Sequence, residues 1–112
     1  VRDYLKDLAQ RTIAPMAREK AQGIQRSVTR VTLRESRTRW GSCSPSGELS
    51  FCWRLVFAPA TVLDYVVAHE VAHLVHLNHS ERFWSLCARL TPEVAGPRRW
   101  LVRHGSTLWR YG

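Results

Sequence analysis

A stretch in the second half of the chain, HEVAHLVHLNHSERFW over residues 69–84, holds four of its five histidines. His69 and His73 frame Glu70 in the pattern H-E-x-x-H. On a helix, residues four apart lie on one face about 6 Å from each other, so both imidazoles can bind one metal ion. Glu70 lies about 100° around the helix from His69, where it can reach a water molecule rather than the ion. The pattern therefore predicts two metal ligands and a general base.

The third ligand must come from beyond this pair. His76 continues the same helical face, but at about 1.5 Å per residue it lies about 7.5 Å past the midpoint of the pair. We expect Asn78 to adopt the left-handed conformation and end the helix, so that His79 returns to the ion. His79 has the spacing of the third histidine in H-E-x-x-H-x-x-G-x-x-H, although His76 occupies the glycine position of that pattern. A carboxylate from a later helix, Glu81 or Glu93, is the alternative ligand.

Two interpretations of these histidines stay open. His76 is either an exposed residue favoured by the helix dipole or a residue at the rim of the site that contacts substrate. His69 and His73 could also be core histidines bonded to the backbone, with Glu70 paired to an arginine. We favour the metal site because polar side chains buried without partners on an otherwise apolar helix cost several kcal/mol.

Composition limits the other functions. The chain has 112 residues, enough for one domain over residues 1–112. Its three cysteines, Cys43, Cys52 and Cys87, are too irregularly spaced for a disulfide framework or a zinc finger, which suggests a reducing, cytoplasmic location. Nothing in the sequence supplies a base for Cys43 as a nucleophile. No apolar run approaches the roughly 18 residues of a membrane span. The net charge of +8 favours anionic partners such as nucleic acid or nucleotides, or a solvated basic surface.

The elements before the motif follow from periodicity and turn signals. Residues 1–22 have apolar positions at helical spacing, with a kink or break expected at Pro15 and an end at Gly23. Residues 27–57 are rich in β-branched types and predict a short mixed sheet with a hairpin turn at 44–47. We expect the strand at 48–54 to lie at the cleft edge, where an extended peptide could pair with it.

The motif itself lies on a helix that we expect over residues 61–76. Thr61, with Asp64 three residues on, resembles a capping box. Apart from the histidines and Glu70, the side chains after this cap are nearly all apolar. A helix that is apolar all round is buried in the centre of a domain.

Further helices are expected after the motif. Ser80 is expected to cap a helix that ends at Thr91, and Gly96 begins a last short helix that stops at Gly105. We expect core positions for Cys87 and for the tryptophans at 40, 53, 84 and 100.

Five segments together make the chain resemble the YgjP-like metallopeptidases, a branch of the zincins related to the SprT-like and WLM groups. They are RWGSC (39–43), GELSFCWRLVFAP (47–59), DYVVAHEVAHLVH (64–76), NHSERFW (78–84) and RRWL (98–101). The resemblance implies that His69, His73 and His79 are metal ligands and that Glu70 is the catalytic base. It also implies that the chain is the C-terminal catalytic part of a longer bacterial protein.

The expected fold is α+β, a small zincin-like metalloprotease domain in which a short sheet packs on the buried H-E-x-x-H helix with flanking helices. The expected reaction is peptide-bond hydrolysis by a metal-activated water with Glu70 as the base. Zn²⁺ is the default metal, with Ni²⁺, Co²⁺ or Mn²⁺ as alternatives. Arg54 and His76 are candidates to contact the substrate, which is a peptide or protein in this interpretation. Hydrolysis of nucleotide or phosphate substrates, and a non-catalytic zinc-stabilised module that binds nucleic acid or protein, are the other functions considered.

Overall fold

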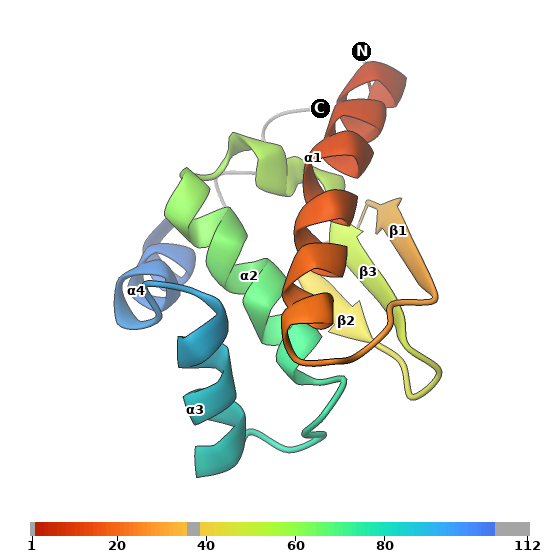
Figure 1. The fold of residues 1–112 in the computed structure, drawn as a ribbon. Coiled ribbons are helices and arrows are strands. Elements are labelled where there is room, and N and C mark those ends of the chain that lie inside the picture. Colours follow the sequence, from red (N-terminus) through yellow and green to blue (C-terminus); the bar gives the residue numbers. More distant parts are fainter. Residues whose placement is uncertain (1, 36–38, 105–112) are drawn as a thin grey trace.

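A computed structural model describes residues 2–35 and 39–104. The predicted helix stop at Gly105 lies outside the described residues. Four α-helices, three strands and one short 3-10 helix make up this part of the chain (Figure 1). Their bounds are α1 Arg2–Gly23, β1 Arg30–Arg34, β2 Gly41–Cys43, β3 Glu48–Cys52, η1 Trp53–Phe57, α2 Ala60–Ala72, α3 Glu81–Leu90 and α4 Ala95–His104. The expected α+β class is confirmed.

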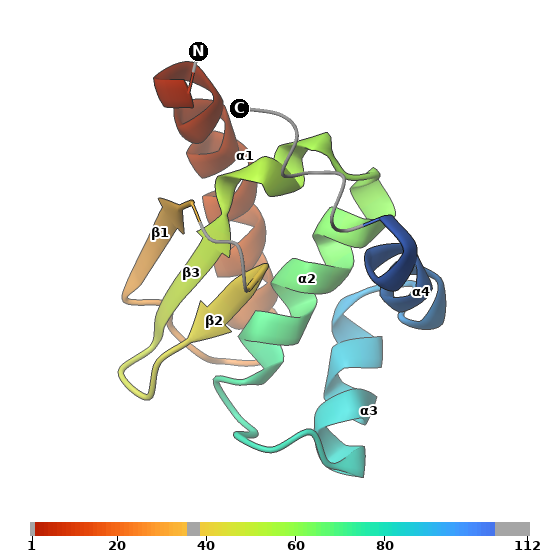
Figure 2. The same cartoon turned by 180° about the vertical axis from the view of Figure 1, so that it is seen from behind.

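The three strands form a mixed sheet in the order β1-β3-β2 (Figure 2). β1 runs parallel to β3, and β2 runs antiparallel to it. The hairpin between β2 and β3 turns where the sequence predicts it, with the amide of Gly47 donating to the carbonyl of Ser44 at 3.0 Å. Gly47 has φ +88°, a value that favours glycine because it has no Cβ.

The prediction that the strand over 48–54 lies at the cleft edge is wrong. β3 is the central strand, so its backbone groups are already used on both sides. It ends at Cys52, and the following residues form η1 instead. β1 and β2 are the two edge strands, and β2 is the one that packs against α2. An extended peptide that pairs with the sheet beside α2 could therefore add to β2 but not to β3.

α2 is the central element of the domain. It packs against α1 and β2 on one side and against α3 and α4 on the other (Figure 1). Nine of its 13 residues are buried, which agrees with the expected helix that is apolar all round. The core around it includes fully buried side chains from α1, the sheet, η1 and α3, among them Ile13, Leu49, Phe51, Trp53, Leu55, Phe83 and Cys87.

The expected end of α1 at Gly23 is confirmed, whereas an interruption at Pro15 is not found. The helix continues through Pro15 without a break. Pro15 is exposed, so water can bind the Arg11 carbonyl that loses its helical partner. α1 does end at Gly23, but the left-handed residue that terminates it is Gln25, with φ 58°. The amide of Arg26 reaches back to the carbonyl of Ala21 at 2.9 Å, which is the pattern of a Schellman cap.

The capping box predicted at Thr61 and Asp64 is also wrong. α2 begins at Ala60, one residue earlier, and no side chain caps it. Asp64 instead accepts hydrogen bonds from Lys20 Nζ at 2.9 Å and from Thr91 Oγ1 at 2.6 Å. The Asp64 carboxylate thus joins α1, α2 and the end of α3.

Within residues 2–35 and 39–104, every helix is too short or too polar to cross a membrane.

Candidate metal centre

The turn that follows α2 brings the chain back towards the first two histidines. α2 ends at Ala72 rather than continuing to His76, and His73 is its last, capping residue. The next amides make tight bonds three residues back, from Leu74 to Val71 at 2.9 Å and from Val75 to Ala72 at 3.1 Å. The left-handed conformation predicted for Asn78 is absent, because Gln25 is the one described non-glycine residue with positive φ. A tight turn, and not a left-handed residue, ends this helix.

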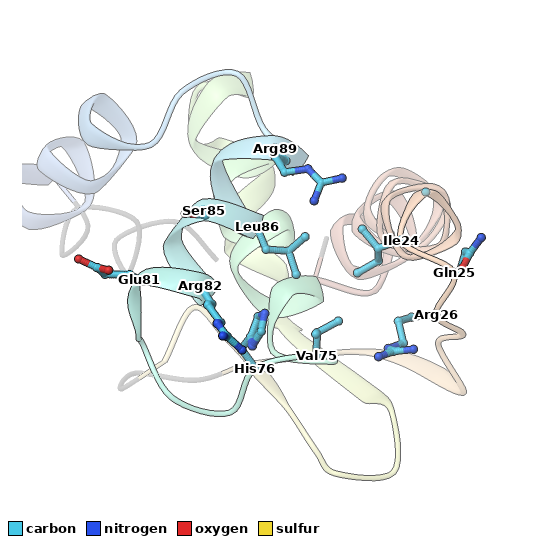
Figure 3. Close-up of a pocket in the computed structure, with 11 residues that line it drawn as sticks. Ile24, Gln25, Arg26, Val75, His76, Glu81, Arg82, Ser85, Leu86 and Arg89 are labelled. Atoms are coloured by element: carbon cyan, nitrogen blue, oxygen red, sulfur yellow. The ribbon is translucent and has the colours of Figure 1, made fainter.

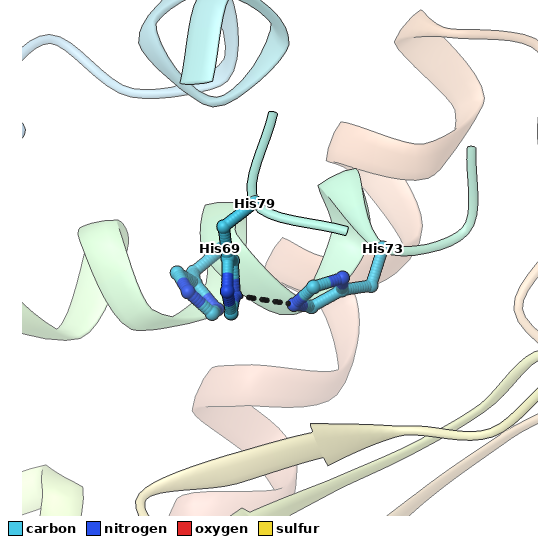
Figure 4. A group of neighbouring side chains, drawn as sticks. All are labelled: His69, His73 and His79. Atoms are coloured by element: carbon cyan, nitrogen blue, oxygen red, sulfur yellow. Dashed lines mark hydrogen bonds between the residues drawn. The ribbon is translucent and has the colours of Figure 1, made fainter. Parts of the chain in front are cut away.

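His69, His73 and His79 come together around one point (Figure 4). Each offers a ring nitrogen, and the three nitrogens all lie within 4.8 Å of one another. The ring centroids are 5.0 Å apart for His69 and His73, 5.1 Å for His69 and His79, and 4.9 Å for His73 and His79. Neither Glu81 nor Glu93 belongs to this group of described residues. We call these three residues the histidine cluster.

The facing nitrogens of His73 and His79 have a separation that fits a shared ion. Nε2 of His73 lies 3.1 Å from Nε2 of His79. Two nitrogens that are each about 2.0–2.1 Å from a tetrahedral ion are about 3.3 Å apart. Nδ1 of His73 lies 3.0 Å from the backbone carbonyl of His76, a contact in which the ring nitrogen must donate. That bond leaves the lone pair on Nε2, the nitrogen that faces His79.

Two aromatic residues of α3, Phe83 and Trp84, pack against the histidine rings. The centroid of Phe83 is 5.0 Å from His69, 4.5 Å from His73 and 4.9 Å from His79. Trp84 stacks on His79 with centroids 5.7 Å apart and planes 27° from parallel. Ser80 is the N-cap of α3, as the sequence predicts, and its hydroxyl accepts a hydrogen bond from the amide of Phe83 at 3.4 Å. This bond fixes the start of the helix that carries both aromatic residues. Trp84 packs against the core with part of its surface buried, as the sequence predicts, but its contact with His79 is not predicted.

The environment of His79 favours the neutral imidazole. Burial lowers the pKa of His79, and the nearby rings of His69 and His73 lower it further. Only a neutral imidazole has the lone pair that binds a metal ion.

Glu70 lies beside the cluster in a closely packed position. The residue is 6% exposed, and its Oε2 lies 3.2 Å from Nδ1 of His69. Gly41 of β2 faces it, and a Cβ on Gly41 would lie 2.8 Å from Glu70 Cγ, closer than such atoms can approach. The missing side chain at Gly41 therefore makes room for the carboxylate. A glycine in a strand can mark such a close approach, and Gly41, the first residue of β2, is the signal for it within RWGSC.

A small cavity of about 210 Å³ opens at Glu70 and His69. The rest of its lining is mostly apolar and comes from α2, α4, β2 and the two residues before β2: Arg39, Trp40, Gly41, Tyr65, Val66 and Leu101. The carboxylate predicted to act as a base and one predicted metal ligand thus share a space next to β2.

The other candidate residues lie elsewhere. Arg54 is 4% exposed in η1, pairs with Glu35 and lies 5.1 Å from the Trp53 ring centroid. It does not line the cavity at Glu70, so this arrangement does not support its predicted contact with substrate. The side chain of His76 lines a different pocket, although its carbonyl holds His73. Burial, and then the charge of Glu70, raise the pKa of the Cys43 thiol to about 11, which does not favour a nucleophile.

Comparison with known proteins identifies the family. The YgjP-like metallopeptidase domain matches residues 1–104. A comparison with curated proteins gives no match. Among solved structures, the crystal structure of the metallopeptidase zymogen of Pyrococcus abyssi abylysin is similar, with a TM-score of 0.62 and 22% identity. The similarity covers 88% of this chain and 93% of that chain, which shows a shared fold. Because the family match spans nearly the whole chain, the protein belongs to the YgjP-like family of metallopeptidase domains.

Proposed function

We propose that this domain is a zinc-dependent peptidase in which His69, His73 and His79 bind the metal and Glu70 is the general base. One observation carries the proposal. Three imidazoles are arranged around a single point, and the buried carboxylate of Glu70 lies beside it and lines a cavity that borders β2. Membership of a metallopeptidase family supports the peptide bond as the target.

The chemistry divides between the metal and the chain. A zinc ion with three histidine ligands supplies a Lewis acid and lowers the pKa of water towards about 7. Glu70 takes a proton from the attacking water and passes it to the leaving amine nitrogen. His69 Nδ1 can hold one oxygen of the carboxylate, which leaves the second oxygen for this proton transfer. Gly41 supplies the space that the carboxylate needs.

The donor set favours zinc among the possible metals. Three neutral imidazoles and an open fourth position are typical of catalytic zinc sites. Nickel, cobalt and manganese are alternatives, and imidazole suits the first two better than manganese, which prefers oxygen ligands. Metal analysis of the purified protein decides between them.

The first experiment separates the peptidase from the two alternative functions. The purified protein is incubated with peptide pools and with nucleotide pools, with and without a chelator. We expect chelator-sensitive cleavage of peptides and no cleavage of nucleotides. Chelator-sensitive release of phosphate would favour the phosphate alternative. A metal-loaded protein that hydrolyses neither pool would instead favour the non-catalytic module.

A pair of matched variants tests the ligand assignment. His79→Ala removes a proposed ligand, and we expect zinc affinity to fall by more than about 100-fold, since loss of a group that merely supports a ligand costs 10–100-fold. His76→Ala removes only a side chain, while the carbonyl that holds His73 remains. We expect this control to keep its zinc. Zinc loss in the control with retention in His79→Ala would transfer the ligand role to His76.

A further inference from the structure

A second pocket borders the turn that follows the histidine cluster's His73, and the proposed reaction does not use it. It has a volume of about 670 Å³ and lies between the end of α1, the turn after α2 and the outer face of α3 (Figure 3). Ile24, Val75 and Leu86 form an apolar floor. We call it the arginine pocket, because Arg26, Arg82 and Arg89 also line it.

The three arginines give the pocket a positive charge that the protein does not neutralise. All three residues are exposed, and in the described part of the chain no carboxylate forms an ion pair with them. Glu81 is the acidic residue of the lining, but Figure 3 shows its side chain pointing away from the space. Guanidinium groups bind carboxylates through two parallel hydrogen bonds.

The chemistry of the lining selects the type of ligand. A nucleic-acid strand carries a charge on every unit and needs a continuous basic stripe. Here the cations surround an apolar floor within one hollow. A polypeptide that places apolar side chains beside acidic ones matches both parts of the lining, because the apolar groups can cover the floor while the carboxylates meet the arginines.

The pocket is also close to the proposed active site. Val75 and His76 line it, and the carbonyl of His76 accepts the hydrogen bond from His73 in the cluster. A single turn of the chain, residues 73–76, therefore separates the arginine pocket from the histidine cluster. A polypeptide bound in the pocket is held next to the metal centre.

We propose that the arginine pocket binds an acidic, apolar segment of a protein substrate and recruits that substrate to the active site. Recruitment rests on the proposed peptidase function, whereas binding of the segment does not. Because the pocket contacts a remote part of the substrate, its loss should raise KM for a substrate that carries the segment and leave kcat unchanged.

Binding is tested first, with zinc-loaded Glu70→Gln protein so that the probe is not cleaved. The probe is a fluorescein-labelled peptide of alternating leucine and glutamate, and binding is followed by fluorescence anisotropy. We expect the double variant Arg82→Glu with Arg89→Glu to weaken binding by at least about 10-fold. The matched control, Arg30→Glu with Arg103→Glu, makes the same change of net charge at exposed positions outside the pocket. We expect it to weaken binding by less than about threefold.

Three results would overturn the proposal. The first is an equal loss in both double variants, which would mean that overall charge attracts the peptide. The second is equally tight binding of the peptide with glutamine in place of glutamate. The third is an oligothymidylate or inorganic phosphate that displaces the peptide at lower concentration than unlabelled peptide does.

Kinetics separate this proposal from the proposed function. The arginine variants are assayed on one cleavable peptide with and without an acidic, apolar extension, and KM should rise only for the extended substrate. If wild-type protein cleaves no peptide but the arginines still decide binding, the docking site stands and the peptidase proposal fails. If wild-type protein cleaves peptides but the arginine variants change neither binding nor KM, the peptidase proposal stands and the docking site fails.

Discussion

At the scale of single residues, Glu70 depends on two neighbours. Nδ1 of His69 lies 3.2 Å from one carboxylate oxygen and can fix its direction. Gly41 provides the space, since even one carbon atom there would lie 2.8 Å from Glu70 Cγ. The position of the proposed base is therefore set partly by a residue that has no side chain and lies on a different element.

Gly41→Ala should lower kcat without removing the metal. The added methyl group forces the Glu70 side chain to move, and a shift of about 1 Å near the reacting atoms can cost about 100-fold in rate. The measurement is kcat together with zinc content. Gly96→Ala is the control, because its Cβ would meet nothing nearer than 3.5 Å, an ordinary contact. Unchanged kcat in Gly41→Ala would show that Glu70 is not held as we describe.

Cys43→Ser should keep most of the activity. With a thiol pKa of about 11, only about 0.03% of Cys43 is thiolate at pH 7.5, so a nucleophilic role is not favoured. The assay is peptide cleavage by the variant beside the wild type. Complete loss of cleavage in a folded, zinc-loaded variant would contradict this prediction and support a catalytic role for Cys43.

At the scale of elements, the end of α2 and the start of α3 build the centre together. α2 carries His69 and Glu70, its capping residue is His73, and the loop that leads into α3 carries His79. Phe83, in the first turn of α3, packs against the rings of all three histidines. The geometry of the cluster thus depends on where one helix ends and where the next begins.

Ser80→Ala should destabilise the protein by about 1 kcal/mol, the usual cost of losing an N-cap. Urea unfolding of metal-free protein measures the change. Ser85→Ala is a matched control, because Ser85 is exposed in the same helix and alanine is the better helix former. We expect the control to be neutral or slightly stabilising. Equal stability of the two variants would mean that the hydroxyl of Ser80 does not act as a cap.

Local signals account for the elements that the sequence predicts well. The hairpin follows from the Ser-Pro-Ser-Gly turn, the buried character of α2 from its apolar composition, and the start of α3 from Ser80. The placement of His79 followed from a distance argument, because a straight helix carries His76 past the ion. The structure brings His79 and not His76 to the first two histidines.

Tertiary contacts decided the features that the sequence did not reveal. Strand order cannot be read from a strand's own residues, so the sequence predicts both arms of the hairpin but puts the wrong one, β3 instead of β2, at the cleft edge. Asp64 looked like a cap because its distant partners, Lys20 and Thr91, are invisible in the local pattern. Trp84 has the same helical spacing as a core residue, and only the folded loop places it on His79.

At the scale of the whole molecule, the metal would join separate parts of the fold. The proposed ligands come from α2 and from the loop before α3, and the core of the domain packs around these elements. An ion that binds the folded state but not the unfolded chain stabilises the fold.

Zinc should therefore raise the melting temperature. At a free zinc concentration 100 times the Kd, the stabilisation is about 2.7 kcal/mol, or about 10 °C for a domain near this size. Calorimetry with zinc and then with excess chelator measures the difference. The His79→Ala variant should lose most of this zinc-dependent rise in melting temperature, while the His76→Ala variant should keep it. An equal increase in all three proteins would place the zinc elsewhere.

Zinc content and peptide turnover, measured together on Glu70→Gln, test the central claim most directly. The amide has nearly the same shape as the carboxylate but cannot accept the proton. We predict full zinc content and a loss of about 100- to 10,000-fold in kcat, the usual contribution of a general base. Undiminished turnover, or loss of the zinc from a folded variant, would contradict the role that we assign to Glu70.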